Sequence, residues 1–443
     1  MKTQVMIVLA GFFVVAAAGS EQLPDAEKPA STERPPAKLS PAENRRAAEA
    51  LAEIIRTQYV LEDVAIRSAE ELLQRTHDGA FDEPRTPKQL AELLNAAVRE
   101  ITGDGHMAVR YEPDFNVEDD YTPKPETGRI HNFGVREAKR MDGNIGYLRF
   151  SGFHFPEVGV EPFAAATTLL ANTDVVILDL RENGGGSSLM SQIVMSYFLG
   201  SEPTQISSMW RRTPEFEKQR WTLPVLPGRR LDRQALYVLV SEATFSAAES
   251  VAYDLQALGR ATIVGERTGG GAHKIDYPSF YPGYRVQMSV QRVINPVTGT
   301  NFEQVGVKPD IVCPPSEALD RAVLAAIELR LPIETDETIR IELRWARDEA
   351  NARLHPIGLS DEHRSGLVGA YGRERIILRN GVLWCQRDDL DPWRMEVMAA
   401  DSFRFPEVTN YRVRFERDET DGKVLRLIGK YLSGTEVVRE RDN

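Results

Sequence analysis

The sequence has little cysteine, no cluster of basic residues and no pair of histidines at metal-ligand spacing. Cys313 and Cys385 are its only cysteines, so no disulfide framework can carry the fold, although one bridge between these two is left open. The net charge of −12, uninterrupted by a Lys/Arg cluster, disfavours nucleic acid and anionic membranes as partners. Without a zinc motif among the seven histidines, we expect no metal and no other cofactor.

An apolar run from Val5 to Val15 lies near the N-terminus, behind Lys2 and ahead of three alanines. The run is shorter than the roughly 20 residues that a membrane-spanning helix needs. We therefore predict a cleaved signal peptide over residues 1–18, with a membrane anchor as the alternative. The protein is expected to be secreted or periplasmic, without stable membrane insertion. Residues 19–39, which hold four prolines among small and charged residues, are predicted to be a disordered linker.

The remaining chain, in a sequence with 42% hydrophobic and 27% charged residues, has the composition of a globular protein and is long enough for several domains. Apolar residues recur at helical spacing between 40 and 102, and Thr86-Pro87 with Gln89 is typical of a helix start. Residues 40–102 are therefore predicted to be a small helical domain. A helical connector over 336–360 and a β-rich domain over 361–443, with Asn380-Gly381 and Asp421-Gly422 as hairpin turns, are predicted to follow.

Between these parts, residues 103–335 alternate short apolar runs with helical stretches at 187–199 and 246–258, which indicates an α/β core. The apolar runs are 145–150, 175–180, 236–240 and 262–264. A further strand around 286–290 alternates apolar with polar residues, so one of its faces is expected to be exposed to water. The polar residues of that strand are Arg285, Gln287, Ser289 and Gln291.

Ser246 follows the apolar run 236–240 and a short polar turn, and it opens an apolar-periodic helix. Unpaired N–H groups and the positive end of the helix dipole stabilise negative charge there, which suits the nucleophile of a hydrolase. The N–H of Ala247 is then the first donor of an oxyanion hole. Because Ser246 with Glu249 also spells a capping box, a purely structural N-cap is the alternative.

A second candidate feature is the glycine run of residues 184–186, which follows Asn183 at the end of an apolar strand. Glycines let the backbone turn sharply and bring N–H groups close to a bound group. The Lys-Ser/Thr ending of a phosphate loop and the spaced glycines of a dinucleotide site are both missing, which disfavours nucleotide binding. A plain tight turn is the alternative.

A catalytic serine needs a base, and two histidines lie in glycine-rich turns. His106, in TGDGHMAV, joins the last predicted helix of the first domain to a strand, where functional loops tend to lie. His273, in TGGGAHK, follows the strand after the Ser246 helix and is the second candidate. Either histidine alone would usually be read as a residue without a catalytic role.

Taken together, residues 40–330 resemble the C-terminal processing serine peptidases, in the branch similar to interphotoreceptor retinoid-binding protein and the tricorn protease core. The matching segments are TGDGHMAV, GNIGYLRFSGF with VVILDLRENGGG, TFSAAESVAYDLQALGRATIVGERTGGGAH, and FEQVGVKPD. The resemblance implies a crotonase-like core of stacked ββα units, with the active site between the helical domain and this core. The chain has only residues 107–143 where many relatives carry a PDZ domain, so no PDZ insertion is expected.

The resemblance also implies roles for individual residues. Ser246 falls on the nucleophile, and Ala247 and Gly185 fall on the oxyanion-hole donors. The lysine of a Ser-Lys dyad would stand at Gly271, so that dyad is absent, and Lys274 lies three residues beyond the position. In the tricorn-like branch a histidine and a glutamate take over, and these match His106 and Glu303.

The expected function is an exported serine peptidase that hydrolyses peptides or unfolded proteins through a Ser-His-Glu acyl-enzyme mechanism. Gly184, Gly186 and His273 are expected on loops near the substrate. Polypeptide is the expected partner, and a homo-oligomer is left open. A non-proteolytic carrier of small apolar ligands on the same scaffold and a non-peptidase acyl hydrolase are the alternatives.

Overall fold

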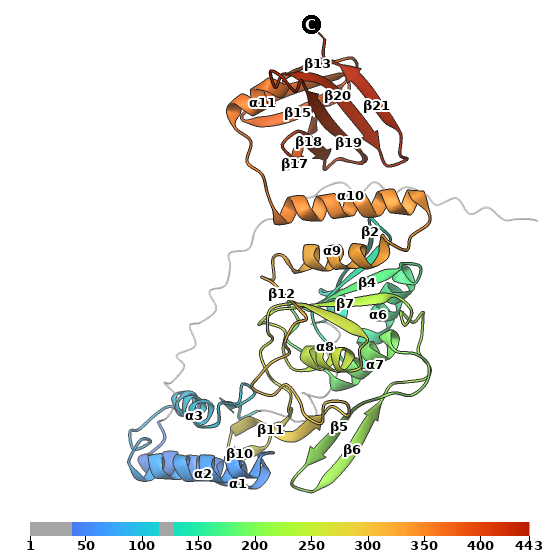
Figure 1. Cartoon of the computed structure of the whole chain (residues 1–443). Helices are drawn as coiled ribbons and strands as arrows, with labels where there is room; N and C mark the ends of the chain where they lie inside the picture. The colour runs from blue at the N-terminus through green and yellow to red at the C-terminus, as the bar shows by residue number, and fades with distance from the viewer. Residues whose placement is uncertain (1–37, 115–127, 443) are drawn as a thin grey trace, which may run out of the picture.

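The computed structural model describes residues 38–114 and 128–442 (Figure 1). The predicted signal peptide lies outside the described residues, and so does the predicted linker as far as residue 37. Leu39, the last residue of that linker, donates its backbone N–H to the carbonyl of Arg85 at 2.8 Å. Within the described ranges, no helix is both long and apolar enough to cross a bilayer.

A three-helix unit lies at one end of the molecule (Figure 1). Its helices are α1 (Pro41–Gln58), α2 (Glu62–His77) and α3 (Pro87–Thr102). α3 begins with a capping box between Thr86 and Gln89 and ends at Gly103, which adopts the left-handed conformation with φ 66°. That turn directs the chain away from the helix and into the loop that carries His106.

The three helices pack on an antiparallel sheet built around one long strand, β11. The sheet contains β1 (Ala108–Tyr111), β5 (Gln205–Arg211), β6 (Phe216–Trp221), β9 (Lys274–Asp276), β10 (Ser279–Tyr281) and β11 (Tyr284–Ile294). Alternate residues of β11, among them Val286 and Met288, are buried in one core with the apolar faces of the helices. This shared core holds the helical unit firmly against the strand that carries Ser289.

The prediction that the opposite face of β11 is exposed to water is wrong. Ser289 is fully buried against the loop that follows α3, and Arg285, which is 5% exposed, donates to the carbonyl oxygen of Tyr277 and to Glu112. The Ser289 hydroxyl donates to Asp104, and the Gln287 amide donates to the carbonyl oxygen of His106 at 2.8 Å. The polar alternation of the strand therefore marks a buried polar contact.

A second sheet, mostly parallel, forms the centre of the molecule. In spatial order it contains β12 (Ile311–Val312), β8 (Ala261–Gly265), β7 (Ala235–Val240), β4 (Val175–Asp179), β3 (Ile145–Phe150) and β2 (Val135–Met141). β2 is antiparallel to β3, and the other neighbours pair in parallel. All five residues of β4 are buried, as expected for a strand that is covered on both faces.

Helices cover both faces of this parallel sheet (Figure 1). One core contains α6 (Pro156–Leu170), α7 (Ser188–Phe198) and α8 (Ala247–Ala257) with alternate strand residues, and the other contains α9 (Ala318–Arg330) and α10 (Glu337–Leu354). The loops at the carboxyl ends of β4 and β7 lead into α7 and α8. These two loops bring residues 183–187 beside residues 241–246.

The strand-rich C-terminal part lies beyond α10, at the end of the molecule opposite α1–α3 (Figure 1). Its elements are α11 (Asp361–Leu367), a sheet of β13 (Gly369–Tyr371), β14 (Glu374–Arg379), β15 (Val382–Arg387) and β16 (Trp393–Arg394), and a sheet of β17 (Glu396–Ala399), β18 (Ser402–Phe405), β19 (Val408–Arg417), β20 (Val424–Tyr431) and β21 (Glu436–Glu440). Arg412 of β19 pairs with Glu349 of α10 at 2.6 Å. Cys313 and Cys385 are both buried free thiols, so the bridge left open by the sequence does not form.

Candidate active site

Ser246 lies between β7 and α8, at the N-cap position of the helix. Its backbone has φ 53° and ψ −117°, a conformation that a residue with a side chain rarely adopts and that costs about 1–3 kcal/mol. Strained strand-to-helix turns of this kind expose nucleophilic serines in hydrolases. An ordinary N-cap does not require the strain, so the backbone favours the catalytic reading of Ser246 over the purely structural one.

The strained turn is held by the carboxylate of Glu249, one helical turn into α8. Glu249 is fully buried, and its Oε2 accepts the N–H of Ser246 and the N–H of Gly271, both at 2.8 Å. Its Oε1 accepts the N–H of Gly270 at 2.7 Å and the hydroxyl of Thr268. The capping box predicted from the sequence thus does more than cap a helix, because Glu249 also fastens the nucleophile turn to the glycine-rich loop 268–273.

Replacing Glu249 with glutamine is expected to lower the free energy of unfolding by about 2 kcal/mol or more. All four groups that contact the carboxylate donate hydrogen bonds to it, so an amide NH2 would leave at least one buried backbone N–H without an acceptor. Chemical denaturation measures the change, and kcat on a peptide substrate should fall with it. Glu242→Gln, an exposed carboxylate four residues before Ser246, is the control and should change neither quantity.

Gly185 lies directly against the nucleophile. It has φ 103°, and a Cβ atom at this position would come within 2.9 Å of the Ser246 Cβ and 3.1 Å of the Ala247 nitrogen, so only glycine fits. The N–H of Ala247 has no hydrogen-bond partner among the described residues. The N–H of Gly185 donates to Asn183 Oδ1 at 2.9 Å. Ala247 is therefore free to stabilise an oxyanion, whereas Gly185 would have to share its proton with Asn183.

The other two glycines of the run are exposed beside this site. Gly184 has open space where a side chain would stand. Gly186 has φ 126° and pairs in parallel with Phe153, whose carbonyl oxygen would lie 2.2 Å from a Cβ at position 186. The run is therefore a tight turn whose middle glycine packs against Ser246, with Gly184 and Gly186 exposed on either side of it.

His106 enters the site from the loop between α3 and β1. Its side chain is 5% exposed, and neither ring nitrogen has a hydrogen-bond partner among the described residues. The ring is tilted against that of Phe245, with the centroids 4.9 Å apart. No hydrogen bond joins His106 to Ser246 in the described structure, so proton transfer between them would require the two side chains to approach each other. Catalytic hydrogen bonds are often long in the absence of substrate.

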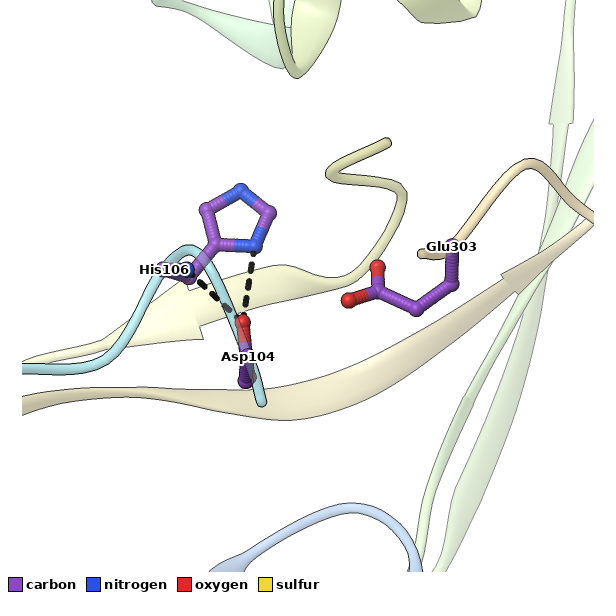
Figure 2. A group of neighbouring side chains, drawn as sticks. All are labelled: Asp104, His106 and Glu303. Carbon is purple, nitrogen blue, oxygen red and sulfur yellow. Dashed lines mark hydrogen bonds and ion pairs between the residues drawn. The ribbon is translucent and has the colours of Figure 1, made fainter. Parts of the chain in front are cut away.

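Asp104 is the carboxylate in direct contact with His106, and no pattern in the sequence indicated it. Its Oδ1 accepts the backbone N–H of His106 at 2.7 Å and lies 3.5 Å from Nδ1 of the ring (Figure 2). Its Oδ2 accepts the hydroxyls of Tyr59 at 3.0 Å and Ser289 at 2.6 Å. Burial would raise the pKa of Asp104, but its interactions with His106 and Ser289 outweigh burial and lower the pKa to about 2. Asp104 is therefore ionised at neutral pH.

Glu303 reaches the same place from the loop between β11 and β12, and its carboxylate points toward Asp104 and His106 (Figure 2). Nitrogen and oxygen atoms of the three side chains lie within 4.8 Å of one another. Glu303 Oε2 accepts the N–H groups of Ala272 at 2.7 Å and His273 at 3.0 Å. Burial and the charge of Asp104 raise the pKa of Glu303 to about 7. Near neutral pH, this carboxyl group thus exists in both protonation states.

His273 and Gly271 line the other side of the His106 ring. His273 is 4% exposed, its Nδ1 lies 3.6 Å from Glu303 Oε2, and burial lowers its pKa to about 4, so its ring is neutral at pH 7. At Gly271 a Cβ would lie 2.7 Å from His106 Cε1 and 2.3 Å from the ring of Phe245. A lysine therefore cannot stand at position 271, where the Ser-Lys dyad would need it.

The chain matches two sequence profiles. Residues 144–313 match Peptidase family S41, and residues 42–136 match the N-terminal domain of Peptidase S41 in eukaryotic IRBP. The two matched segments include every residue of the site described above and follow one another along the chain.

Two curated proteins are similar in sequence. The chloroplastic carboxyl-terminal-processing peptidase 3 of Arabidopsis thaliana is 26% identical over 222 residues, which cover 48% of this chain and 40% of that protein. A carboxy-terminal-processing protease of Bartonella bacilliformis is 30% identical over 180 residues, 39% of each chain. The chain thus spans about two fifths of the length of these relatives. A solved putative peptidase from Parabacteroides merdae has a TM-score of 0.46 at 20% identity, covering 66% of this chain and 96% of its own.

Proposed function

The chain belongs to peptidase family S41, and from this premise we propose that it is a serine peptidase that hydrolyses peptides or unfolded proteins with Ser246 as its nucleophile. The observation that carries the proposal is the strained backbone of Ser246, which a buried carboxylate holds next to Phe245, whose ring contacts the imidazole of His106. A protein uses such an arrangement where a side chain must be both exposed and fixed in direction.

In the proposed mechanism, His106 removes the proton of the Ser246 hydroxyl as the oxygen attacks the carbonyl carbon of the scissile bond. The N–H of Ala247 donates to the resulting oxyanion, with Gly185 as the second donor once it shares its proton. His106 then protonates the leaving amine, which produces an acyl-enzyme on Ser246. Water, activated by the same histidine, releases the acyl group and restores the hydroxyl.

Two carboxylates would assist His106 in different ways. Asp104 is ionised and nearest to Nδ1, so it orients the ring and stabilises the imidazolium that forms in the transition state. Glu303 adds a second negative charge when it is ionised, and it ties the loop 268–273 to the site through two backbone N–H groups. The expected Ser-His-Glu site is thus extended by Asp104 to four side chains.

The core over 103–335 is crotonase-like, with its ββα units stacked, no PDZ insertion, and the active site facing the helical domain 40–102. The connector 336–360 and the β domain 361–443 follow it. Export through cleavage after residue 18 places the enzyme outside the cytoplasm, where polypeptide is its substrate.

A fluorophosphonate probe tests the proposed nucleophile directly. Such probes react with a serine oxygen only where a base and an oxyanion hole activate it. The folded protein is expected to gain one probe mass, and peptide mapping should place it on Ser246. Cleavage of unfolded casein, measured in parallel, separates a peptidase from other acyl hydrolases. Absence of labelling on folded protein would favour a non-proteolytic carrier of small apolar ligands and overturn the proposal.

A further inference from the structure

We propose that Asp104, His106 and Glu303 bind a divalent transition-metal ion such as Zn²⁺, and that the bound ion inhibits the enzyme reversibly. The binding itself is independent of the proposed peptidase activity, whereas the inhibition rests on it. The ion is not part of the catalytic mechanism, because the histidine that would hold it is the one that must accept the proton of Ser246.

The three side chains converge from separate parts of the fold (Figure 2). Asp104 and His106 come from the loop after α3, and Glu303 comes from the loop after β11. Their ligand atoms lie within 4.8 Å of one another, and no other such group of three occurs among the described residues. Metal–ligand bonds of about 2.0–2.2 Å to nitrogen and carboxylate oxygen require these atoms to close in by about 1 Å, which side-chain rotations can supply.

The ring of His106, whose two nitrogens have no hydrogen-bond partner among the described residues, is an independent sign of a missing ligand. A side chain that is 95% buried normally has partners for its polar atoms, since a buried unpaired nitrogen costs about 1–3 kcal/mol. Both nitrogens of His106 lack one in the described structure. Substrate binding would engage Nε2 only while the serine reacts. A metal ion accepts the lone pair of a neutral imidazole and would remove this cost in the resting enzyme.

The charge of the site also favours a cation. The only ion pairs of Asp104 and Glu303 among the described residues are with histidines, His106 at 3.5 Å and His273 at 3.6 Å. Neither carboxylate forms an ion pair with a lysine or arginine of the described ranges, so two acidic groups share a buried space without a fixed positive charge from these residues. A divalent ion would neutralise the negative charges of both carboxylates. One imidazole and two carboxylates form a ligand set suited to zinc, with one position left for water.

Groups outside the three ligands already orient them. The hydroxyls of Tyr59 and Ser289 hold one oxygen of Asp104, and the N–H groups of Ala272 and His273 hold one oxygen of Glu303. Glu303 Oε1 accepts none of these hydrogen bonds, and Asp104 Oδ1 accepts only the backbone N–H of His106, which leaves a second lone pair for an ion. Such outer contacts typically raise the affinity of a metal site 10- to 100-fold.

Binding is tested on the Ser246→Ala protein, stripped with EDTA and dialysed, so that the readout does not depend on catalysis. Isothermal titration with ZnCl2 is expected to give one ion per chain, and Co²⁺ should produce the absorption bands of a protein-bound ion. His106→Asn and Glu303→Gln, each in this background, are expected to lower the affinity about tenfold or more. His77→Asn, at an exposed histidine, is the control. Circular dichroism shows whether each variant is folded.

The outcomes separate the two proposals. If the Ser246→Ala protein binds no Zn²⁺, or if folded His106→Asn and Glu303→Gln bind it as well as the control, the metal site is overturned whatever the peptidase assay shows. If the ion binds at this site but the wild type cleaves and labels nothing, the metal site stands and the proposed function fails. If both hold, Zn²⁺ should abolish fluorophosphonate labelling of the wild type, and EDTA should restore it.

Discussion

Ser246→Ala is expected to lower kcat on a peptide substrate by about 10⁴- to 10⁶-fold and to leave the protein folded. Alanine removes the attacking oxygen but keeps the backbone N–H that donates to Glu249, so the strained turn retains its anchor. The loss should therefore appear in kcat and in probe labelling, with little change in KM or in the melting temperature.

Ser250→Ala is the matched control for this variant. Ser250 lies one turn further along α8, and its backbone N–H bonds to the carbonyl oxygen of Ser246 at 3.0 Å. Both substitutions remove one serine hydroxyl at or near the start of α8. A difference in kcat between the two variants is therefore due to the position of the lost hydroxyl and not to the loss of a hydroxyl as such. Equal kcat values for Ser246→Ala and wild type would refute the assignment of the nucleophile.

His106→Asn is expected to lower kcat by a similar factor, about 10⁴-fold or more, because the serine then has no base. Asparagine keeps a polar side chain of comparable reach, and the backbone N–H of residue 106 can still donate to Asp104. Stopped-flow measurement of acyl-enzyme formation should locate the defect in the acylation step. His77→Asn, at a side chain that is 85% exposed, should behave as wild type.

Substitutions of Asp104 and Glu303 show which of the two carboxylates orients His106. Asp104→Asn removes the charge beside Nδ1, while the hydroxyls of Tyr59 and Ser289 can turn to accept from the new amide. Glu303→Gln removes a group whose pKa is already raised to about 7 and which is partly neutral at that pH. We therefore expect Asp104→Asn to have the larger effect on kcat at pH 7. A larger effect of Glu303→Gln would make Glu303 the principal orienting group of the histidine.

Much of the fold could be predicted because the residues that a helix or strand buries recur at a regular spacing along the sequence. The apolar run 145–150 coincides with β3, Ile145–Phe150, and the helical stretch 246–258 contains α8, Ala247–Ala257. β3 lies within the parallel sheet and α8 packs on one of its faces, so most of their residues that point into the core are apolar. For β11 the alternation of apolar and polar residues led to a wrong prediction. Polar residues on one face of a strand can contact either solvent or a buried polar site, and the sequence pattern does not distinguish the two.

The candidate site residues could be predicted where a residue type with the right chemistry stands in a suitable local pattern. Ser246 at a helix start, the glycines beside it and a histidine in a turn are local patterns, and the family resemblance joined them across the chain. Asp104 stands two residues before His106, yet the sequence offered no reason to prefer it over other aspartates. Its importance comes from Tyr59 and Ser289, which lie 45 and 185 residues away along the chain.

The sequence by itself determined that Ser246 opens a helix after a buried strand, that the chain is acidic and poor in cysteine, and that no lysine stands at the dyad position. Only the tertiary structure decided that Glu249 fastens the nucleophile turn to loop 268–273 and that Asp104 contacts His106 more closely than Glu303 does. The physical reason is that a hydrogen bond acts over about 3 Å in space, whatever the separation along the chain. Local order follows from neighbouring residues, whereas the partners of a buried charge are chosen by the packing of distant ones.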